Sequence, residues 1–452
     1  MVRVLRRASA IHVPGLRHGL QVRTFALILY TPNPLFLPPD RMSSPVPSPA
    51  HRVDANSRVL RLKRGEERRL AAGHLWAFSN EVDTDRTPLG QLAPGAVVEL
   101  RSYRDAFLAY AYVNPHALIC ARILSRDAAQ PVSGELIEQR LTAALALRER
   151  LGDARYCRWV FGESDLLPGL VLDRYGNVVV GQIATAGMEA LREPIEQAVR
   201  EVVDPQALIW KNDSAARDLE QLPHLLQPAF GELPGEVGIV EGGLSFAAPL
   251  AAGQKTGWFY DQSANRARLR RYVVAGARVL DVCSYVGAWA VTALDQGAGR
   301  ACCVDASPVA LEYAEANARR NGNSIEPLRA DAFDALQALL ARGDRFDVVV
   351  LDPPAFIKRK KDIPRGQAAY RKLNQLAMAV LADEGLLVSC SCSYHLAADE
   401  LLGAIQSAAR HGGRFVQILE AAGQSPDHPL HPAIPETRYL KAFFCRVTRA
   451  VG

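Results

Sequence analysis

The second half of the chain alternates short apolar runs with helical stretches, and this alternation limits the folds open to it more than any other feature. The run ARVLDV at 277–282 leads into a tight turn with Gly287 and a helical stretch. The run RACCVD at 300–305 leads into a second helical stretch, from Pro308 to Gly322. This order predicts an open parallel α/β sheet. Ligands of such sheets bind beyond the carboxyl ends of the strands, so we expect the functional residues there.

Polar residues follow the first three predicted strands of this sheet. Gly287 would let a ligand approach the backbone of the first turn, although a strand–turn–helix with a glycine can also be purely structural. Asp305 ends the second strand and could accept both hydroxyls of a ribose. Asp331 follows the third strand and could meet an adenine amino group. Because the spacing is not G-x-G-x-x-G, a nicotinamide site is disfavoured.

The fourth and fifth predicted strands end in a proline loop and in a cysteine-rich segment. The fourth runs into Asp352, Pro353 and Pro354, where two prolines stiffen a loop that can hold a planar base. The fifth ends in Cys-Ser-Cys at 390–392. The eight cysteines of the chain include no pair or His/Cys cluster with zinc-ligand spacing. We therefore expect no metal site, no disulfide scaffold and a reducing cytoplasmic compartment.

Length and charge describe a multidomain globular protein. The chain has 452 residues, 49% of them hydrophobic and 22% charged, which excludes disordered and fibrous classes. No apolar run approaches the roughly 18 residues that a bilayer crossing needs, so we expect no membrane association. Residues 1–41 hold six arginines and one acid, which accounts for the whole net charge of +5. The remaining chain is neutral, and nucleic-acid binding would require a local basic patch.

Four segments are predicted. Residues 1–57 form an extension that is either a transit peptide, a disordered linker rich in Pro and Ser, or an artefact of a start that really lies at Met42. Residues 58–127 form a small β-rich domain, and residues 128–240 form a middle α+β module with a helix at 134–152 and a β-hairpin. Residues 241–452 contain the α/β sheet. In the β-rich domain, one cluster could contact phosphates or simply be solvated surface: Lys63, Arg64, Arg68 and Arg69.

These motifs together resemble a known family. The order VLDVCSYVG, Asp305, Asp331, LDPPAF and SCS is similar to class I S-adenosylmethionine-dependent methyltransferases. More closely, GHLWAFSNEV, GESDLLPGLVLDRYGN, GQKTGWFYDQSANR, LDPPAFIKRK, SCSCS and DHP…YLKAFFCRV resemble the bacterial 23S (large-subunit) ribosomal RNA cytosine-5 methyltransferases. The resemblance spans residues 58–450. It implies a Rossmann-like catalytic domain that is preceded by a PUA domain and a small middle domain.

The resemblance also implies a mechanism. Carbon 5 of cytosine is a poor nucleophile, so a thiolate first adds to carbon 6. The family's S-C-S motif assigns this role to Cys392, which would need a lowered pKa. Cys390 is the alternative and is expected to turn into the sheet. Asp352 would hydrogen-bond the base. The proline loop has no second cysteine, so the base that removes the carbon 5 proton is unassigned.

Two sets of binding residues are predicted, and the first follows from the same resemblance. The S-adenosylmethionine site would comprise Ser284, Tyr285, Gly287, Asp305, Asp331, Lys255, Thr256, Gly257 and Asp261. The basic run beside the proline loop could meet RNA phosphates, although such runs are usually solvated surface. The predicted contacts of the 23S RNA are Pro353, Pro354, Phe356, Lys358, Arg359, Lys360, Lys361 and Arg365. The Lys255-Thr256 pair is not a phosphate-binding loop, because the first glycine of that motif is missing at the needed distance. A homodimer is left open.

Three hypotheses remain at this point. The first is a cytosine-5 methyltransferase of ribosomal RNA, which depends on Cys392. The second is a methyltransferase of an exocyclic amino group on adenine or guanine, because Asp-Pro-Pro-Phe loops also hold such amines. The third is a non-catalytic RNA-binding or ribosome-assembly factor, which the intact cofactor motifs disfavour.

Overall fold

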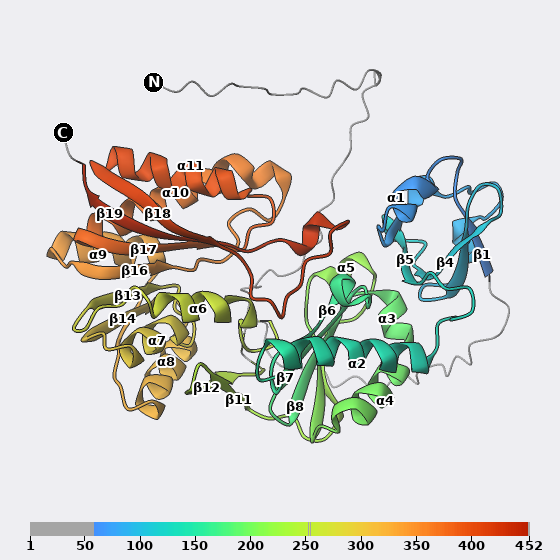
Figure 1. The fold of residues 1–452 in the computed structure, drawn as a ribbon, viewed down its shortest axis with the longest axis horizontal. Coiled ribbons are helices and arrows are strands. Elements are labelled where there is room, and N and C mark those ends of the chain that lie inside the picture. The colour runs from blue at the N-terminus through green and yellow to red at the C-terminus, as the bar shows by residue number, and fades with distance from the viewer. Residues whose placement is uncertain (1–57, 252, 254, 451–452) are drawn as a thin grey trace, which may run out of the picture.

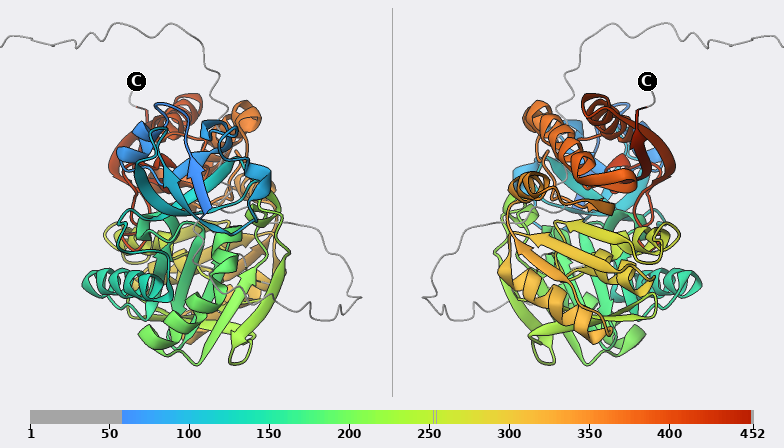
Figure 2. Two further views of the ribbon diagram at one scale, coloured as in Figure 1. Left: turned by 90° about the vertical axis from the view of Figure 1, so that its right-hand side faces the viewer. Right: turned by 90° about the vertical axis from the view of Figure 1, so that its left-hand side faces the viewer.

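The computed structural model describes residues 58–251, 253 and 255–450, so the predicted extension lies outside the described residues. Three lobes follow one another along the chain (Figure 1). We call them the N-terminal lobe (β1 to β5), the middle lobe (α2 to β10) and the C-terminal lobe (β11 to β19). Figure 2 shows the N-terminal lobe above the middle lobe when the molecule is viewed from their side.

The N-terminal lobe is a five-stranded sheet in the order β1-β3-β4-β5-β2 with one short α-helix and two 3-10 turns, Ser79–Glu81 and Leu89–Gln91. Its inward-facing residues, among them Leu60, Val98 and Ala111, are completely buried. These side chains alternate with more exposed neighbours along β3, as expected for strands with one covered face. The elements are β1 (Arg58–Arg61), α1 (Glu67–Ala71), β2 (Trp76–Phe78), β3 (Val97–Arg101), β4 (Phe107–Val113) and β5 (Ile119–Ser125).

The middle lobe is a second five-stranded sheet, in the order β10-β9-β8-β7-β6, packed against helices. Its first helix begins after Ser133, whose hydroxyl accepts a hydrogen bond from the Leu136 amide and so caps the helix. Two helices follow one another closely in this lobe, because the short helix that ends at Ala190 is succeeded by a longer one that begins at Arg192. The elements are α2 (Gly134–Leu151), β6 (Tyr156–Phe161), β7 (Leu170–Tyr175), β8 (Val178–Ile183), α3 (Ala186–Ala190), α4 (Arg192–Val203), β9 (Ala207–Asn212), α5 (Ala216–Leu219) and β10 (Leu225–Phe230).

A two-stranded hairpin, β11 (Glu236–Glu241) and β12 (Leu244–Pro249), joins the middle lobe to the C-terminal sheet. Its apolar side chains, such as Val237 and Phe246, share one core with Ile209 of the middle lobe and Val286 of the C-terminal lobe. The boundary predicted at residue 240 lies inside β11. The predicted domain limits therefore stay predictions.

The C-terminal lobe contains a seven-stranded sheet in the order β15-β14-β13-β16-β17-β19-β18. The first five strands in this order are parallel, as the sequence predicts, whereas β19 runs antiparallel to both of its neighbours. Helices α6, α7 and α8 cover one face, and α9, α10 and α11 cover the other (Figures 1 and 2). The elements are α6 (Ser263–Leu269), β13 (Arg278–Val282), α7 (Ala288–Asp295), β14 (Arg300–Asp305), α8 (Pro308–Arg320), β15 (Glu326–Arg329), α9 (Ala332–Arg342), β16 (Phe346–Leu351), α10 (Ile363–Val380), β17 (Leu381–Ser391), α11 (Ala398–His411), β18 (Arg414–Ala422) and β19 (Lys441–Arg449).

Buried polar contacts hold the N-terminal lobe on the middle lobe. The Trp76 indole donates to Glu163 at 3.0 Å, and Arg122 forms a buried ion pair with Glu220 at 2.8 Å. Asn114 donates to the same Glu220 carboxylate at 2.7 Å. None of the helices that the structure describes combines the length and the apolar character that a bilayer crossing needs.

Candidate active site

The turn between β13 and α7 lies at the carboxyl edge of the parallel strands and has an unusual backbone. Cys283, Tyr285 and Gly287 all have positive φ, at 62°, 49° and 78°. The Tyr285 amide donates to one oxygen of Asp305 and the Ser307 amide to the other, each at 2.9 Å. A Cβ on Gly287 would lie 2.9 Å from the Cβ of Ala314 in α8. The glycine is therefore required both by its φ and by close packing of α7 against α8.

A carboxylate that sequence reasoning missed lies beneath this turn. Asp281 is completely buried in β13, and one of its oxygens accepts a hydrogen bond from the Ala290 amide at 3.2 Å. The other oxygen has no hydrogen-bond partner among the described residues. Burial raises the pKa of Asp281 to about 8. The sequence did hold a signal for this residue: an aspartate inside the otherwise apolar run VLDV at 279–282, directly before the turn.

The acids at this edge fit S-adenosylmethionine, whose ammonium group, ribose hydroxyls and adenine amine are all donors. Asp281 offers an unsatisfied buried oxygen, and Asp305 ends β14 beside the turn. Asp331 is exposed as the N-cap of α9, where it accepts from the Phe333 amide at 2.8 Å. Ser284 is buried next to Tyr285 in the same turn. These side chains surround the position that the sequence predicts for the cofactor.

The segment that contains Lys255, Thr256 and Gly257 reaches this turn only in part. The Tyr285 hydroxyl donates to the Gly257 carbonyl at 2.9 Å. The Lys255 ammonium lies 3.5 Å from the Asp261 carboxylate. Thr256 instead is fully buried, and its hydroxyl donates to Asp173 of the middle lobe. The structure thus brings Gly257 to the turn at Tyr285 and pairs Lys255 with Asp261, whereas the Thr256 side chain points to the middle lobe.

Asp261 is a buried anion that several groups stabilise. Burial alone would raise its pKa, but the charges of Lys255 and His428 and a hydrogen bond from the Tyr439 hydroxyl outweigh this effect and lower it. The carboxylate is therefore ionised. It holds Lys255 and Tyr439 on the same side of the sheet edge.

The proline loop presents Asp352 at the end of β16. Its two oxygens accept hydrogen bonds from the Gln262 amide at 2.8 Å and from the Trp289 indole at 3.1 Å. Burial nevertheless raises the pKa of Asp352. Each oxygen keeps a further lone pair for a substrate. Gln262 and Trp289 hold Asp352 in place, and neither was singled out from the sequence, although Gln262 lies within the motif GQKTGWFYDQSANR.

Cys390 and Cys392 differ in exposure because β17 ends at Ser391, and residues two apart share a face only within a strand. Cys390 is 1% exposed inside the sheet, whereas Cys392 follows the last residue of β17 and is partly exposed. The Cys392 sulfur lies 3.9 Å from the carbonyl oxygen of Pro353 in the proline loop. The predicted fifth strand thus ends one residue earlier than expected, at Ser391.

The environment of the Cys392 thiol contradicts the expectation of a lowered pKa. Burial raises the pKa of Cys392 to about 11, and the charges of Lys255 and Lys441 only partly counteract it. Lys441 is itself buried and donates to the carbonyls of Ser393 and Tyr439. Burial lowers the pKa of Lys441 to about 8. In this state the thiol is protonated at neutral pH.

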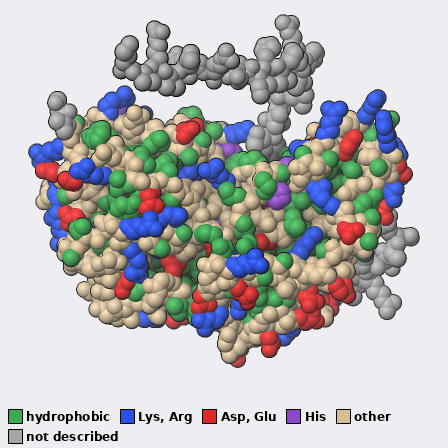
Figure 3. Space-filling view, in the orientation of Figure 1, with side chains coloured by type: hydrophobic (Ala, Val, Ile, Leu, Met, Phe, Trp, Pro, Cys, Tyr) green, Lys and Arg blue, Asp and Glu red, His purple; other side chains and the backbone are tan. Residues whose placement is uncertain are grey.

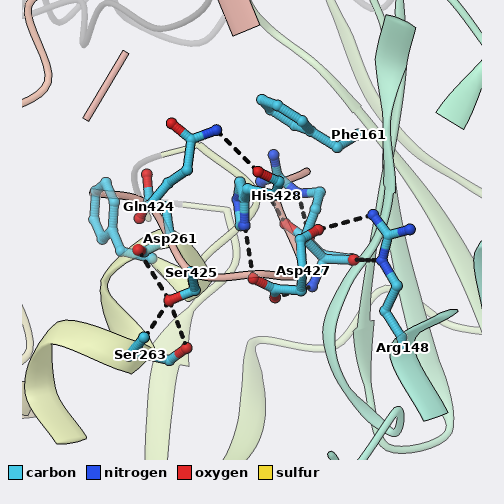
Figure 4. Close-up of polar contacts among 12 residues, drawn as sticks. Arg148, Phe161, Asp261, Ser263, Gln424, Ser425, Asp427 and His428 are labelled. Carbon is cyan, nitrogen blue, oxygen red and sulfur yellow. Dashed lines mark hydrogen bonds and ion pairs between the residues drawn. The ribbon is translucent and has the colours of Figure 1, made fainter. Parts of the chain in front are cut away.

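A loop at 423–428 connects this site to the middle lobe (Figure 4). Only its last two residues figured in the sequence analysis, as the start of the DHP motif. The Asp427 carbonyl accepts from Arg148 at 2.8 Å, and its carboxylate accepts from the Arg158 amide at 3.0 Å. On the other side, the Ser425 hydroxyl donates to the Asp261 carbonyl at 3.0 Å. The segment that contains Asp261 is thereby connected to the middle lobe.

The predicted RNA contacts differ in their exposure. Pro354 and the four basic residues at 358–361 are exposed beside the proline loop, as is Arg365. Pro353 is buried. The Phe356 ring lies 4.8 Å from the Tyr370 ring, so it packs toward the core. Figure 3 also shows Lys and Arg side chains on the N-terminal lobe, at the right, and along the top of the molecule.

The basic cluster of the N-terminal lobe is only partly available to a phosphate backbone. Lys63, Arg64 and Arg68 are exposed. Arg69 is half-buried, forms an ion pair with Glu81 at 2.7 Å and stacks its guanidinium over the Phe78 ring. Arg69 therefore has a structural role in this lobe.

Comparisons with known proteins agree with this architecture. Residues 60–126 match the family described as PUA-like domain, and residues 223–444 match the family described as S-adenosylmethionine-dependent methyltransferase. The fold predicted from the sequence is confirmed. A putative SAM-dependent methyltransferase from Streptococcus mutans and a putative methyltransferase complexed with SAH share the fold at 21% identity, with TM-scores of 0.72 and 0.73. Each alignment covers 86% of this chain and 100% of the other.

Curated relatives match over nearly their whole length. Ribosomal RNA large subunit methyltransferase I of Klebsiella pneumoniae is 36% identical over 396 residues, which are 86% of this chain and 98% of the relative. The protein of the same name from Salmonella arizonae is 35% identical and is covered to 97%. The chain therefore belongs to the ribosomal RNA large subunit methyltransferase I family and is an S-adenosylmethionine-dependent methyltransferase with an N-terminal PUA-like domain.

Proposed function

We propose that this methyltransferase acts on a cytidine of large-subunit (23S) ribosomal RNA and forms 5-methylcytidine through a covalent bond between Cys392 and carbon 6 of the base. The names of its relatives support the RNA substrate. The observation that carries the chemistry is the position of the Cys392 sulfur, 3.9 Å from the Pro353 carbonyl and therefore at the loop that carries Asp352. A thiol at the base-binding loop is what addition to carbon 6 requires.

Asp352 and Cys392 would act on different atoms of the base. As the Cys392 thiolate forms its bond to carbon 6, the protonated form of Asp352, which burial favours, gives its proton to ring nitrogen 3. The resulting carboxylate accepts hydrogen bonds from nitrogen 3 and the amino group, and it takes the proton back when the bond between sulfur and carbon 6 breaks. When bound, the cofactor supplies an electrophilic methyl group to carbon 5. Loss of the carbon 5 proton then allows the bond between sulfur and carbon 6 to break, which restores the thiolate and the aromatic base.

Binding of the substrate must lower the pKa of Cys392, because a thiol with a pKa of about 11 is mostly protonated. Lys255 and Lys441 are the cations that lower it. Lys441, whose pKa is about 8, exists partly as a free amine near neutral pH and can take up the thiol proton. The exposed basic residues at 358–361 would meet RNA phosphates beside the base.

The raised pKa of Cys392 also supports a second candidate, transfer to an exocyclic amine of adenine or guanine. That reaction needs no thiolate, and the Asp352 carboxylate would accept a proton of the amine. The two candidates differ in whether Cys392 is required. The cytoplasmic location and a homodimer also stay predictions.

The test is methyl transfer from labelled S-adenosylmethionine to unmodified large-subunit ribosomal RNA, with the product nucleoside identified by mass spectrometry. We expect 5-methylcytidine from the wild type, none from Cys392→Ala and near-normal activity from Cys390→Ala, the matched control inside the sheet. A methylated purine, or transfer by Cys392→Ala, would favour the amino-group reaction instead.

A further inference from the structure

The loop that joins β18 to β19 packs on the N-terminal lobe. Its residue Ile434 is completely buried in the core of that lobe, together with Leu60 and Trp76. A Cβ on Gly73 would lie 3.8 Å from the Cβ of Ala433, so the segment before β2 and the loop lie side by side. Figure 1 shows the loop extending from the C-terminal sheet toward the N-terminal lobe. The junction of these two lobes is therefore a packed surface outside the cofactor site.

Three basic side chains meet at this junction: His74 and Arg126 of the N-terminal lobe, and His431 of the loop. The Arg126 guanidinium donates to the His74 carbonyl at 2.9 Å. Arg126 is exposed and both histidines are partly exposed, so a ligand can reach all three. None of the carboxylates that the structure describes forms an ion pair with any of them. The junction therefore presents donors and positive charge without an acidic partner.

Backbone amides fix the orientation and the protonation of both rings. Nδ1 of His74 accepts from the Trp76 amide at 3.1 Å, and Nδ1 of His431 accepts from the Ala433 amide at 3.2 Å. Nδ1 therefore carries no proton, and each neutral ring carries its proton on Nε2. Neither Nε2 has a hydrogen-bond partner among the described residues. Each ring thus offers one N–H donor to a ligand.

The electrostatics of the junction keep both rings neutral near pH 7. Burial and the charges of neighbouring basic groups, Arg69 first, lower the pKa of His74 to about 4. Burial and the charge of Arg126 also lower the pKa of His431. Arg69 already pairs with Glu81, so its charge is balanced within the lobe. The charge available to a ligand is that of Arg126.

The same loop connects the junction to the site around Cys392. Tyr439 and Leu440, at the end of the loop, form one apolar cluster with Phe161, and Cys392 packs against this cluster. His431 precedes Tyr439 by eight positions, so the two residues lie at most about 28 Å apart. An RNA strand whose target base reaches Cys392 can therefore extend to the junction within about eight stacked nucleotides.

We propose that His74, Arg126 and His431 together bind one phosphate of the RNA substrate, on the strand that carries the methylated base. This inference rests on the proposed function, because it needs an RNA substrate. The charged oxygens of a phosphodiester are acceptors only, and they match two N–H donors beside a guanidinium. A phosphate contact fixes the position of a strand but does not read its sequence. The site would therefore orient the RNA across two lobes while Asp352 and Cys392 act on the base.

The test measures the affinity of the full-length protein for a fluorescent single-stranded RNA by anisotropy, over a range of salt concentrations. Arg126→Gln removes the charge of the site. Its matched control is Arg410→Gln, at an exposed position of α11. Binding of S-adenosylhomocysteine, by calorimetry, reports that each variant is folded.

Two further variants remove the neutral donors. In His74→Asn and His431→Asn, the side-chain oxygen replaces Nδ1 as acceptor for the Trp76 or Ala433 amide, but the distal N–H donor is lost. The matched control is His411→Asn, at the exposed end of α11. These variants test the donors without changing the charge of the protein near pH 7.

We expect Arg126→Gln to reduce the slope of log affinity against log salt by about 0.7, the value for one lost cation contact with a single strand. His74→Asn and His431→Asn should each weaken binding roughly tenfold at unchanged slope, because a neutral ring releases no counterion. Both controls should keep the wild-type affinity and slope. A wild-type slope in Arg126→Gln, or wild-type affinity in both Asn variants, would overturn the inference.

The binding assay and the nucleoside analysis fail separately. Absence of 5-methylcytidine would refute the proposed function and leave the slopes and affinities to decide the phosphate site. Formation of 5-methylcytidine by a wild type whose Arg126→Gln variant keeps the full slope would refute the phosphate site alone.

Discussion

The buried ion pair between Arg158 and Asp173 allows a quantitative prediction. The Arg158 side chain is 3% exposed and Asp173 is 0% exposed, and the two form paired contacts of 2.5 and 3.0 Å. Asp173→Asn removes the charge that faces a buried guanidinium. Leaving a buried charge uncompensated costs about 3–5 kcal/mol. We therefore expect the free energy of unfolding of the middle lobe to fall by that amount.

The matched control is the pair Arg155 and Asp153, whose side chains are 68% and 43% exposed. Solvent screens this pair, so Asp153→Asn should cost less than about 1 kcal/mol. Unfolding in urea can be followed by the fluorescence of the buried Trp159 and Trp210. Replacing both partners, by Arg158→Met with Asp173→Leu, should recover part of the loss, because no buried charge then remains.

Asp173→Asn should also disturb the segment at 255–257, which is predicted to bind the cofactor. The Thr256 hydroxyl donates to Asp173, and Thr256 lies between Lys255 and Gly257. We expect Asp173→Asn to weaken binding of S-adenosylhomocysteine severalfold, as measured by calorimetry. If Asp173→Asn costs no more unfolding free energy than Asp153→Asn, the assignment of a strongly coupled buried pair is refuted.

Three further predictions concern the site itself. Because the pKa of Cys392 is about 11 without substrate, its alkylation by iodoacetamide should accelerate about tenfold per pH unit from pH 7 to 9; a rate independent of pH, by mass spectrometry, would contradict the raised pKa. Gly287→Ala should lower the free energy of unfolding by about 1–3 kcal/mol and weaken S-adenosylhomocysteine binding, because of the positive φ and the contact with Ala314; unchanged denaturation and binding would refute it. The folded-state pKa of Lys441, about 8, lies below its ordinary value of 10.5, so the unfolded chain binds more protons between these pH values and stability should rise with pH there. Lys441→Met should remove up to about 3 kcal/mol of this rise, seen as a smaller difference between denaturation at pH 7.5 and pH 10.

The order of strands and helices could be predicted wherever local signals are strong. The helix from Pro308 has a capping serine, a proline in its first turn and a polar C-terminus, and the structure forms it over Pro308–Arg320. The predicted strands before Asp305 and Asp352 are also present. The expected hairpin forms between β7 and β8. These elements depend on residues close together in the chain.

The electrostatics of the site could not be predicted in the same way. A nucleophilic role required a lowered pKa for Cys392, but the actual shift depends on burial and on the distances to Lys255, Asp352 and Lys441. These groups lie between 40 and 137 residues away along the chain. Sequence spacing gives no distances between them, so even the direction of the shift was unavailable.

The sequence by itself determined the parallel sheet and the acids at its carboxyl edge, because strand periodicity and strand ends are local properties. The preference for Cys392 over Cys390 came from the resemblance to the family's S-C-S motif and stays a prediction. Only the tertiary structure decided that Thr256 pairs with Asp173 of another lobe and that Gln262 and Trp289 hold Asp352. It also decided that His74, Arg126 and His431 meet at one junction. The physical reason is that burial and pairing between distant segments depend on how the three lobes pack, which leaves no periodic signal in the chain.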